Sequence, residues 1–474
     1  MKRFAAMVLT VIVALALLAG GAQAAEITIN TYTGSLQFTG DTSGAYAIVL
    51  VDADSGSILY QKNMDEQIEP ASTTKILTLL IALEQGNMDD TVKVESSAAA
   101  ANVRGSTLGL IANEEVNFED LINGMMMKSG NDAAIAVAQH MAGSVEAFAS
   151  LMNAEAEKIG MTHSNFVTPH GMHADGHYST ARDMALLTLY AMKNTKLMEI
   201  VGQESYTMPA DNKHSSTWLA ENTNKLLQPD LSYYYQNCTG IKTGSTSAAG
   251  DCLVASASKD GMNLACLIFK TAENDPIRWT LTKDLFEWGF NNFETVDVTQ
   301  LLQNTAALKE QVENAPAGDS GVLEFNMPEA GTTYVTLSKT TVDGILDGTD
   351  TVKAEAAWDV EYPLQAPITE NDPLGSITYK SESTGEEIYS GVLVAARSIG
   401  EASAGTTGSP TVSMQTPVEP PTVVSKKDSP WIWLWALIPA GLIAFLVVRL
   451  LTVNKRNRKR FKRRQPHYSY KIRK

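Results

Sequence analysis

The stretch Pro70-Ala-Ser-Thr-Thr-Lys-Ile-Leu-Thr78 opens the segment around which the first half of the chain is organised. Over residues 73–84 apolar side chains recur at helical spacing, and this pattern predicts an amphipathic helix. Its apolar face consists of Ile76, Leu77, Leu80, Ile81 and Leu83. The same spacing returns in four later segments, at residues 118–127, 132–141, 145–159 and 181–191. We therefore expect a helical region that begins at this stretch.

Strand-like runs flank the helical region on both sides. They lie at residues 46–52, 57–61, 253–257 and 263–269. The turn sequences Ala53-Asp54-Ser55-Gly56 and Lys259-Asp260-Gly261 join them in pairs, which predicts two hairpins. A last helix is expected at residues 278–288. Strands at both ends of a helical middle predict an α+β domain over residues 45–294, with helices packed on one mainly antiparallel sheet and the domain's two ends adjacent.

The rest of the chain divides by composition. Residues 25–44 form a short polar lead-in. Residues 295–399 contain short alternating runs between turn residues, which predicts a small all-β domain, a sandwich or similar. Residues 400–430 are rich in Ser, Thr, Gly and Pro, a composition that cannot build a core and predicts a semi-extended stalk.

The charges are distributed unevenly along the 474 residues. The chain carries 37 Lys and Arg against 53 Asp and Glu, a formal net charge of −16. Residues 1–24 and 449–474 contain basic residues and no acids, so the body between them is strongly acidic. This excludes a nucleic-acid-binding body, because phosphate contacts need a basic surface.

The two ends predict where the protein resides. Residues 1–24 have a basic start, an apolar run and the small-residue site Ala22-Gln23-Ala24, the pattern of a secretory signal peptide. A first membrane helix is the alternative, and the short run and cleavage site disfavour it. Residues 431–448 carry no charge and are long enough to cross a bilayer, so we assign a transmembrane helix to residues 431–453.

The basic tail, residues 454–474, sets the expected orientation. By the positive-inside rule it stays in the cytoplasm, which places the body outside the cell membrane, on the cell-wall side, as a single-pass protein. Binding of the tail to nucleic acid or to specific anionic lipids is an alternative, and we favour the simpler role of a topology signal.

A serine and a lysine stand three residues apart at the start of the first helix. Ser72 and Lys75 then lie on one helical face, one turn apart. A neutral lysine there can take the hydroxyl proton, and burial beside a second cation lowers a lysine pKa. Alone the spacing is weak evidence, because it occurs often by chance and Ser72 could be an ordinary N-cap.

Two further motifs carry polar side chains. Ser129-Gly130-Asn131 lies in the turn before the helix expected at Asp132, where capping is the alternative role. Lys242-Thr243-Gly244 lies in a strand-like run, and its alternative is an ordinary turn. Its glycine allows close approach of another backbone, while lysine and threonine offer a cation and a hydroxyl to a carboxylate.

Together the three motifs are far more specific than any one of them. Ser-x-x-Lys, Ser-x-Asn and Lys-Thr-Gly, in this order, form the signature of class A β-lactamases and penicillin-binding proteins. Further matching blocks lie at residues 70–78, 127–134, 170–172, 178–184 and 240–246. Over about residues 45–290 the chain resembles the low-molecular-weight penicillin-binding proteins, specifically the serine D-Ala-D-Ala carboxypeptidases of the D-alanyl-D-alanine carboxypeptidase A type. The second domain, the stalk and the anchor fit the family's layout less specifically.

The resemblance implies a substrate and a mechanism. Ser72 would form an acyl-enzyme on the penultimate D-alanine of a peptidoglycan stem pentapeptide, with Lys75 as its general base. Ser129 and Asn131 would relay protons and bind the substrate amide. Water would then release the shortened peptide, and β-lactams would inhibit by acylating the same serine. The family fold implied is a β-lactamase/transpeptidase-like domain.

The resemblance also implies a carboxylate site. Lys242 and Thr243 would hold the terminal carboxylate, and Gly244 would clear space beside it. The backbone N–H of Ser245, with that of the nucleophile, would form an oxyanion hole. Arg278, in an Arg-x9-Trp-Gly-Phe sequence, matches a family arginine near this site. No cofactor is implied.

Two groups of residues invite other interpretations. His163, His170, His173 and His177 crowd together with Asp175, which suggests a zinc site. We favour an ordinary loop, since the resembling family has a loop there and uses no metal.

The cysteines raise a separate question. Cys238 and Cys252 flank a turn centred near Ser245, so they could be cross-strand neighbours, and a disulfide between them is a hypothesis motivated by this spacing and by the expected location.

Three other functions compete with the carboxypeptidase. A membrane-anchored β-lactamase shares the nucleophile, but usually needs neither a second domain nor a permanent anchor. A DD-endopeptidase would cut D-alanyl cross-links instead. A non-catalytic muropeptide or β-lactam sensor is the alternative from another class, and the intact catalytic motifs and short tail speak against it.

Overall fold

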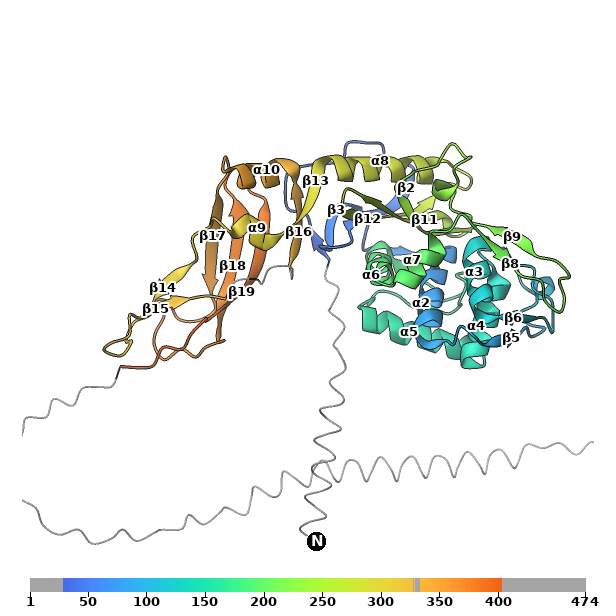
Figure 1. Ribbon diagram of the computed structural model, residues 1–474, viewed down its shortest axis with the longest axis horizontal. Helices are drawn as coiled ribbons and strands as arrows, with labels where there is room; N and C mark the ends of the chain where they lie inside the picture. The colour runs from blue at the N-terminus through green and yellow to red at the C-terminus, as the bar shows by residue number, and fades with distance from the viewer. Residues whose placement is uncertain (1–28, 327, 329–332, 403–474) are drawn as a thin grey trace, which may run out of the picture. The chain divides into compact units, whose positions relative to one another are not determined.

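The computed structural model describes residues 29–326, 328 and 333–402 (Figure 1). The predicted signal peptide, almost all of the stalk, the transmembrane helix and the basic tail lie outside these residues. Among the helices that the structure describes, none is long and apolar enough to cross a membrane.

A six-stranded sheet forms the centre of the first domain, in the order β1-β3-β2-β12-β11-β10. Its strands are β1 (Asn30–Thr31), β2 (Ala45–Asp52), β3 (Ser57–Lys62), β10 (Cys238–Thr246), β11 (Gly250–Lys259) and β12 (Met262–Thr271). Strand β1 runs parallel to β3, and the other neighbouring pairs are antiparallel. Leu50 of β2 lies opposite Cys266 of β12. The predicted antiparallel sheet with adjacent domain ends is thereby confirmed.

Helices cover both faces of this sheet (Figure 1). They are α2 (Lys75–Gln85), α3 (Phe118–Lys128), α4 (Asn131–Ala142), α5 (Val145–Ile159), α6 (Ala181–Met192), α7 (Thr195–Val201) and α8 (Ile277–Asn292). Val49 and Val51 of β2 join the core beneath α2 to α7, whereas Ile48 and Leu50 join the core beneath α8. Alternate side chains of a strand point to opposite faces, so a sheet covered twice needs an almost wholly apolar strand.

The helices predicted by periodicity are all present, with small shifts at their ends. Several short elements of the same domain were not predicted. They are α7, β4 (Gln67–Ile68), β5 (Thr91–Lys93), β6 (Glu115–Asn117), β7 (Ser179–Thr180), β8 (Ser205–Met208), β9 (Trp218–Glu221) and the 3-10 turns η1 (Ala71–Thr74), η2 (Ala100–Asn102) and η3 (Lys225–Leu227). Elements this short carry too few residues for either period to be visible.

The second domain has its own core, which runs from Val296 to Ile399. Its strands are β13 (Phe293–Asp297), β14 (Lys309–Gln311), β15 (Val322–Glu324), β16 (Tyr334–Ser338), β17 (Val352–Trp358), β18 (Pro373–Ser381) and β19 (Glu387–Val394). Two helices, α9 (Val298–Leu302) and α10 (Lys339–Asp347), also belong to it, so the predicted all-β composition is wrong. The Ser338 hydroxyl caps the N-terminus of α10, and Gly348 ends the helix. The helix buries the apolar side chains of Val342 and Ile345, and two such residues are too few to show a helical period in the sequence.

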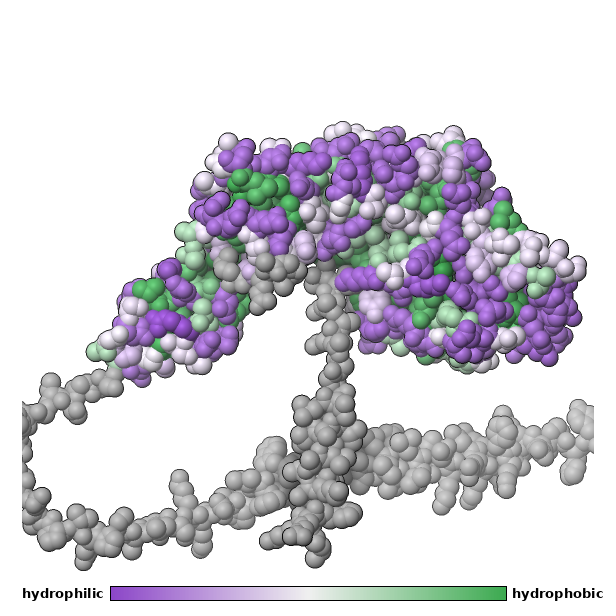
Figure 2. All heavy atoms as spheres, in the orientation of Figure 1, coloured by the Kyte–Doolittle hydropathy of each residue, from purple (hydrophilic) through white to green (hydrophobic). Residues whose placement is uncertain are grey.

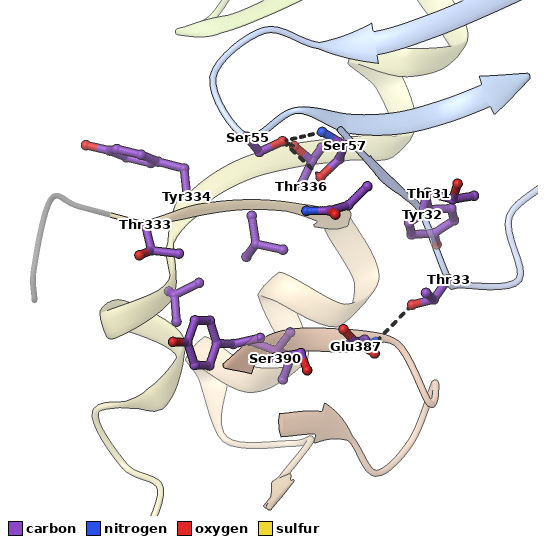
Figure 3. Close-up of a pocket in the computed structure, with 15 residues that line it drawn as sticks. Thr31, Tyr32, Thr33, Ser55, Ser57, Thr333, Tyr334, Thr336, Glu387 and Ser390 are labelled. Carbon is purple, nitrogen blue, oxygen red and sulfur yellow. Dashed lines mark hydrogen bonds between the residues drawn. The ribbon is translucent and has the colours of Figure 1, made fainter. Parts of the chain in front are cut away.

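Polar side chains join β13 and β16 to the β2–β3 hairpin. Thr295 Oγ1 donates to Asp52 Oδ2 at 2.7 Å, and the hydroxyls of Ser55 and Thr336 lie 2.6 Å apart. A cavity of about 390 Å³ lies beside these contacts, lined mainly by Ser, Thr and Tyr side chains (Figure 3). Hydrophilic residues cover most of the face shown in Figure 2, in keeping with the acidic composition.

Candidate active site

Ser72 lies in η1, the 3-10 turn that leads into α2, and is half-buried. Neither η1 nor α2 has a side-chain cap, so the alternative role of Ser72 as an N-cap is wrong. The preceding residue, Ala71, has a positive φ of 48°. A Cβ built on Gly171 would lie 1.7 Å from the Ala71 carbonyl oxygen. Glycine is therefore needed at position 171 for the loop that contains it to pack against η1.

Lys75, at the start of α2, is completely buried and contacts three oxygens. Its Nζ lies 3.0 Å from Ser72 Oγ, and it donates to Asn131 Oδ1 at 2.7 Å and to the His170 carbonyl oxygen at 3.1 Å. Burial, followed by the positive charge of Lys242, lowers the pKa of Lys75 well below its ordinary value, while the charge of Asp132 acts in the opposite direction. This is the environment of a lysine that can be neutral.

Asn131 is fixed from three sides at the first position of α4. Its backbone N–H donates to the Ser106 carbonyl at 2.8 Å, and its Nδ2 donates to the Arg104 carbonyl at 2.7 Å. The side-chain oxygen is left for Lys75, which fixes the orientation of the amide. The suggested capping role of Asn131 is wrong, since α4 has Gly130 at its N-cap and no side-chain cap.

Asp132 secures the loop that meets Asn131. Its carboxylate accepts from the backbone N–H groups of Leu108, Gly109 and Leu110 at 2.7, 2.9 and 3.0 Å. Ser129 is buried at the end of α3, in a left-handed conformation with φ of 56°. The serine and the asparagine of the motif therefore lie on either side of one tight turn.

Strand β10 forms the other wall of the site at the edge of the sheet. A Cβ added to Gly244 would lie 3.1 Å from the backbone nitrogen of Ser72, so this strand runs directly against η1. Lys242 is buried, and its burial lowers its pKa to about 7. The hydroxyls of Thr243 and Thr223 lie 2.7 Å apart, and Ser245 is exposed.

Arg278, in the first turn of α8, lies at the Ser245 end of β10. Its Nη1 lies 3.0 Å from Asp251 Oδ2, and Asp251 is the strand partner of Ser245. Its guanidinium also lies over the Trp279 ring. Among the described residues it makes no hydrogen bond to the Lys-Thr-Gly motif, so the structure brings it to the neighbourhood of β10 without joining it to the motif.

The histidines predicted to crowd together have separate partners. His177 is held between the Thr74 hydroxyl, 3.1 Å from Nε2, and the Val167 N–H, which donates to Nδ1 at 3.0 Å. His173 Nδ1 lies 3.0 Å from Glu69 Oε1. Burial lowers the pKa of His170 to about 3 and that of His177 to about 4. This part of the chain packs around η1, as the loop interpretation expects.

The disulfide hypothesis is wrong, because all three cysteines are free. Cys252 lies opposite Gly244, whereas Cys238 lies opposite Ala257. The hairpin turn falls between Thr246 and Gly250, later than the sequence suggested, and this register places the two thiols at different levels of the ladder.

Three contributors to the site were not predicted. They are the carbonyl of Arg104, the carbonyl of His170 and the hydroxyl of Thr223. The two carbonyls are backbone atoms, which every residue carries, so no pattern of residue types could have identified their role. The segment His170-Gly171-Met172 did match the resembling family, but that match did not indicate a role for the His170 carbonyl.

Known proteins resemble this chain in sequence and in fold. Residues 36–273 match the family model described as D-alanyl-D-alanine carboxypeptidase. D-alanyl-D-alanine carboxypeptidase DacF of Bacillus subtilis strain 168 is 32% identical over 71% of this chain and 82% of its own length. DacC of Escherichia coli strain K12 is 33% identical over 71% of this chain and 80% of its own length.

A solved structure extends the likeness to the second domain. Penicillin-binding protein 5 from Haemophilus influenzae is 30% identical and superimposes with a TM-score of 0.61, covering 77% of this chain and 100% of its own. The fold, the placement of the three motifs around the buried Lys75 and the similarity to these proteins all indicate the same family. The chain belongs to the family of serine D-alanyl-D-alanine carboxypeptidases.

Proposed function

We propose that Ser72 is the nucleophile with which this protein removes the terminal D-alanine from peptidoglycan stem pentapeptides. The observation that carries the proposal is the placement of Lys75 Nζ between Ser72 Oγ and Asn131 Oδ1. A neutral amine has two N–H bonds, and the oxygens of Asn131 and His170 accept both. Its lone pair is then available to the serine hydroxyl.

Acylation follows from this arrangement. Ser72 Oγ attacks the carbonyl carbon of the penultimate D-alanine while its proton passes to Lys75 Nζ. The N–H groups of Ser72 and Ser245 stabilise the oxyanion. The C–N bond then breaks, and the departing D-alanine nitrogen takes a proton that reaches it from Lys75 by way of the Ser129 hydroxyl. Asn131 holds the lysine and binds the substrate amide.

Carboxylate recognition is assigned to β10. Lys242 supplies the positive charge and Thr243 a hydroxyl, whose orientation Thr223 sets through the 2.7 Å contact. A bound carboxylate raises the pKa of Lys242, because an opposite charge favours the protonated form. Arg278 adds positive potential at the far end of the strand, where Asp251 holds it.

Deacylation completes the cycle. Water, activated by Lys75, attacks the Ser72 ester, and the tetrapeptide leaves. A β-lactam acylates the same serine. Its leaving group stays attached to the ring-opened product, so it cannot diffuse away to admit water.

We also assign the body to the cell-wall side of the membrane, anchored by residues 431–453, because the basic tail at residues 454–474 favours the cytoplasm.

One experiment separates the competing functions. Purified protein and a Ser72→Ala control are incubated with a fluorescent penicillin and, separately, with a pentapeptide ending in D-Ala-D-Ala. Stable Ser72-dependent labelling with release of D-alanine is the expected result. Rapid loss of label with penicillin turnover would indicate a β-lactamase. Stable labelling without D-alanine release would favour an endopeptidase or a sensor, and cleavage of a cross-linked dimer separates these two.

A further inference from the structure

Three side chains with metal-binding chemistry converge away from the active site. They are Glu114, just before β6, and Asp211 and His214 in the turn between β8 and β9. One ligand atom from each lies within 4.8 Å of the others. His214 Nδ1 is 3.4 Å from Glu114 Oε1 and 3.1 Å from Asp211 Oδ2.

Backbone amides orient both carboxylates toward this common point. The Ile111 N–H donates to Glu114 Oε2 at 2.6 Å, and the N–H groups of Lys213 and His214 donate to Asp211 Oδ1 at 2.6 and 2.8 Å. Each carboxylate therefore uses one oxygen to fix its direction and turns the other toward His214. Outer hydrogen bonds of this kind are what orient the ligands of protein metal sites.

The spacing of the ligand atoms matches a small tetrahedral ion. Bonds of about 2.0 to 2.1 Å to nitrogen and oxygen place neighbouring ligand atoms of a tetrahedron about 3.3 to 3.4 Å apart. The separations of His214 Nδ1 from the two carboxylate oxygens, 3.4 and 3.1 Å, lie close to this value, and the two oxygens lie within 4.8 Å of each other. A neutral imidazole with two carboxylates is a donor set that suits zinc and similar transition ions.

The burial of the group favours a cation as well. The side chain of Glu114 is only 3% exposed, yet it lies beside a second carboxylate and faces only one histidine. The His214 side chain is 30% exposed, so the group opens to solvent on one side, where an ion could enter and a water could complete its coordination.

We propose that Glu114, Asp211 and His214 bind one divalent transition-metal ion, with zinc as the best match. The ion joins the β8–β9 turn to residues 111–115, which Asn212 already contacts by accepting from the Glu115 N–H at 2.9 Å and donating to the Asn113 carbonyl at 3.0 Å. The role is structural, since the site lies outside the serine chemistry.

The ion would act on the loop that supports the active site. Residues 104–110 form hydrogen bonds with the side chains of Asn131 and Asp132. The next residue, Ile111, donates its backbone N–H to the carboxylate of Glu114. Fixing Glu114 thereby fixes the far end of this loop. Metal binding is expected to raise thermal stability and to leave the identity of the substrate unchanged.

The test is metal binding by the untagged full chain after removal of metals with a chelator. Zinc is added in an isothermal titration, and the melting temperature is followed in parallel. We expect one zinc ion per chain and a rise in melting temperature of several degrees, because a ligand that binds only the folded state stabilises it. Cobalt(II) substitution should give the visible absorption of a four-coordinate site.

Variants assign the binding to this cluster. His214→Ala and Glu114→Gln should each weaken zinc binding at least tenfold and abolish the rise in melting temperature. His173→Ala is the matched control, because it removes another histidine that lies 3.0 Å from a carboxylate, and it should bind zinc as the parent chain does. A cooperative melt of each variant shows that it is folded.

Two outcomes would overturn the proposal. One is zinc affinity that stays the same in His214→Ala, which would place the ion elsewhere. The other is a parent chain whose melting temperature does not respond to zinc, in which case the three side chains form only a hydrogen-bonded group.

Discussion

The Nζ of Lys75 lies 3.0 Å from the Oγ of Ser72, one helical turn further along the same segment. Because α2 follows η1 without a break, the backbone places the two side chains on one face of the same segment. Lys75→Met keeps the volume and removes the base, so we expect acylation by a fluorescent penicillin to fall about 10²- to 10⁴-fold. Lys309→Met, on an exposed lysine of β14, is the control and should acylate normally. Full activity in Lys75→Met would exclude the lysine as base.

The acylation rate should rise with pH. Lys75 acts when neutral, and burial with the Lys242 charge lowers its pKa well below 10.5, so the midpoint of the profile should also lie well below 10.5. Removing the charge in Lys242→Met raises the pKa of Lys75 again, and the midpoint should move to higher pH. Rates of β-lactam acylation across pH 5 to 10, in parent and variant, measure this. A shift to lower pH would contradict the assignment.

The stability of Lys242→Met should differ from that of the parent chain in a pH-dependent way. The folded-state pKa of Lys242 is about 7, and that of an unfolded lysine is about 10.5, so the unfolded state binds more protons between these values. Burial of this lysine is therefore most destabilising at pH 7 and below, and the effect declines toward pH 10.5. Lys242→Met should melt at least 2 to 4 °C higher than the parent at pH 7, corresponding to about 1 kcal/mol. The difference should shrink at pH 10, and a difference that grows with pH would contradict the argument.

Gly244→Ala should impair acylation more than folding. The added Cβ would lie 3.1 Å from Ser72 N and 3.2 Å from the Pro70 carbonyl, backbone atoms that cannot move aside like a flexible side chain. The oxyanion donors would then separate, and loss of one such donor reduces rates about 10²- to 10³-fold. Gly400→Ala, whose Cβ meets nothing closer than 3.9 Å, is the control. Equal rates for the two variants in a D-alanine release assay would argue against this geometry.

Asp132→Asn should loosen the loop that supports Asn131. The substitution removes the charge that receives the N–H groups of Leu108, Gly109 and Leu110, so we expect a loss of about 1 to 3 kcal/mol in unfolding free energy. Because the loop also binds the Asn131 amide, kcat should fall while labelling remains specific for Ser72. Asp175→Asn, on an exposed carboxylate, should change neither quantity. Unaltered denaturation midpoints in Asp132→Asn would show that the loop is held by other contacts.

Local sequence patterns predicted the fold of the first domain well, because each of its long elements buries an apolar face of its own. Of the side chains predicted for the site, Ser72, Lys75, Asn131 and Lys242 lie together although only the first two are neighbours in sequence. Their catalytic roles stay predictions. The backbone contributions of Arg104 and His170 were not predictable, since every residue has a backbone carbonyl and the sequence does not show which one will accept a hydrogen bond. The register of β10 on β11 was not predictable either, because it depends on the position of the hairpin turn. This register keeps Cys238 and Cys252 from being cross-strand neighbours.

The pairing of β2 with β12 has a consequence for how the molecule is made. Val49 finds its partner, Leu267, only after most of the first domain has been synthesised, so this contact has very high sequence separation and forms late. Strand β10, which carries Lys242 and Gly244, joins the sheet only through β11 and β12. A growing polypeptide therefore contains Ser72 long before it contains the wall opposite it. Until the sheet closes, Ser72 lacks the strand that carries Lys242 and Gly244, and we therefore expect the nascent chain not to react with a penicillin.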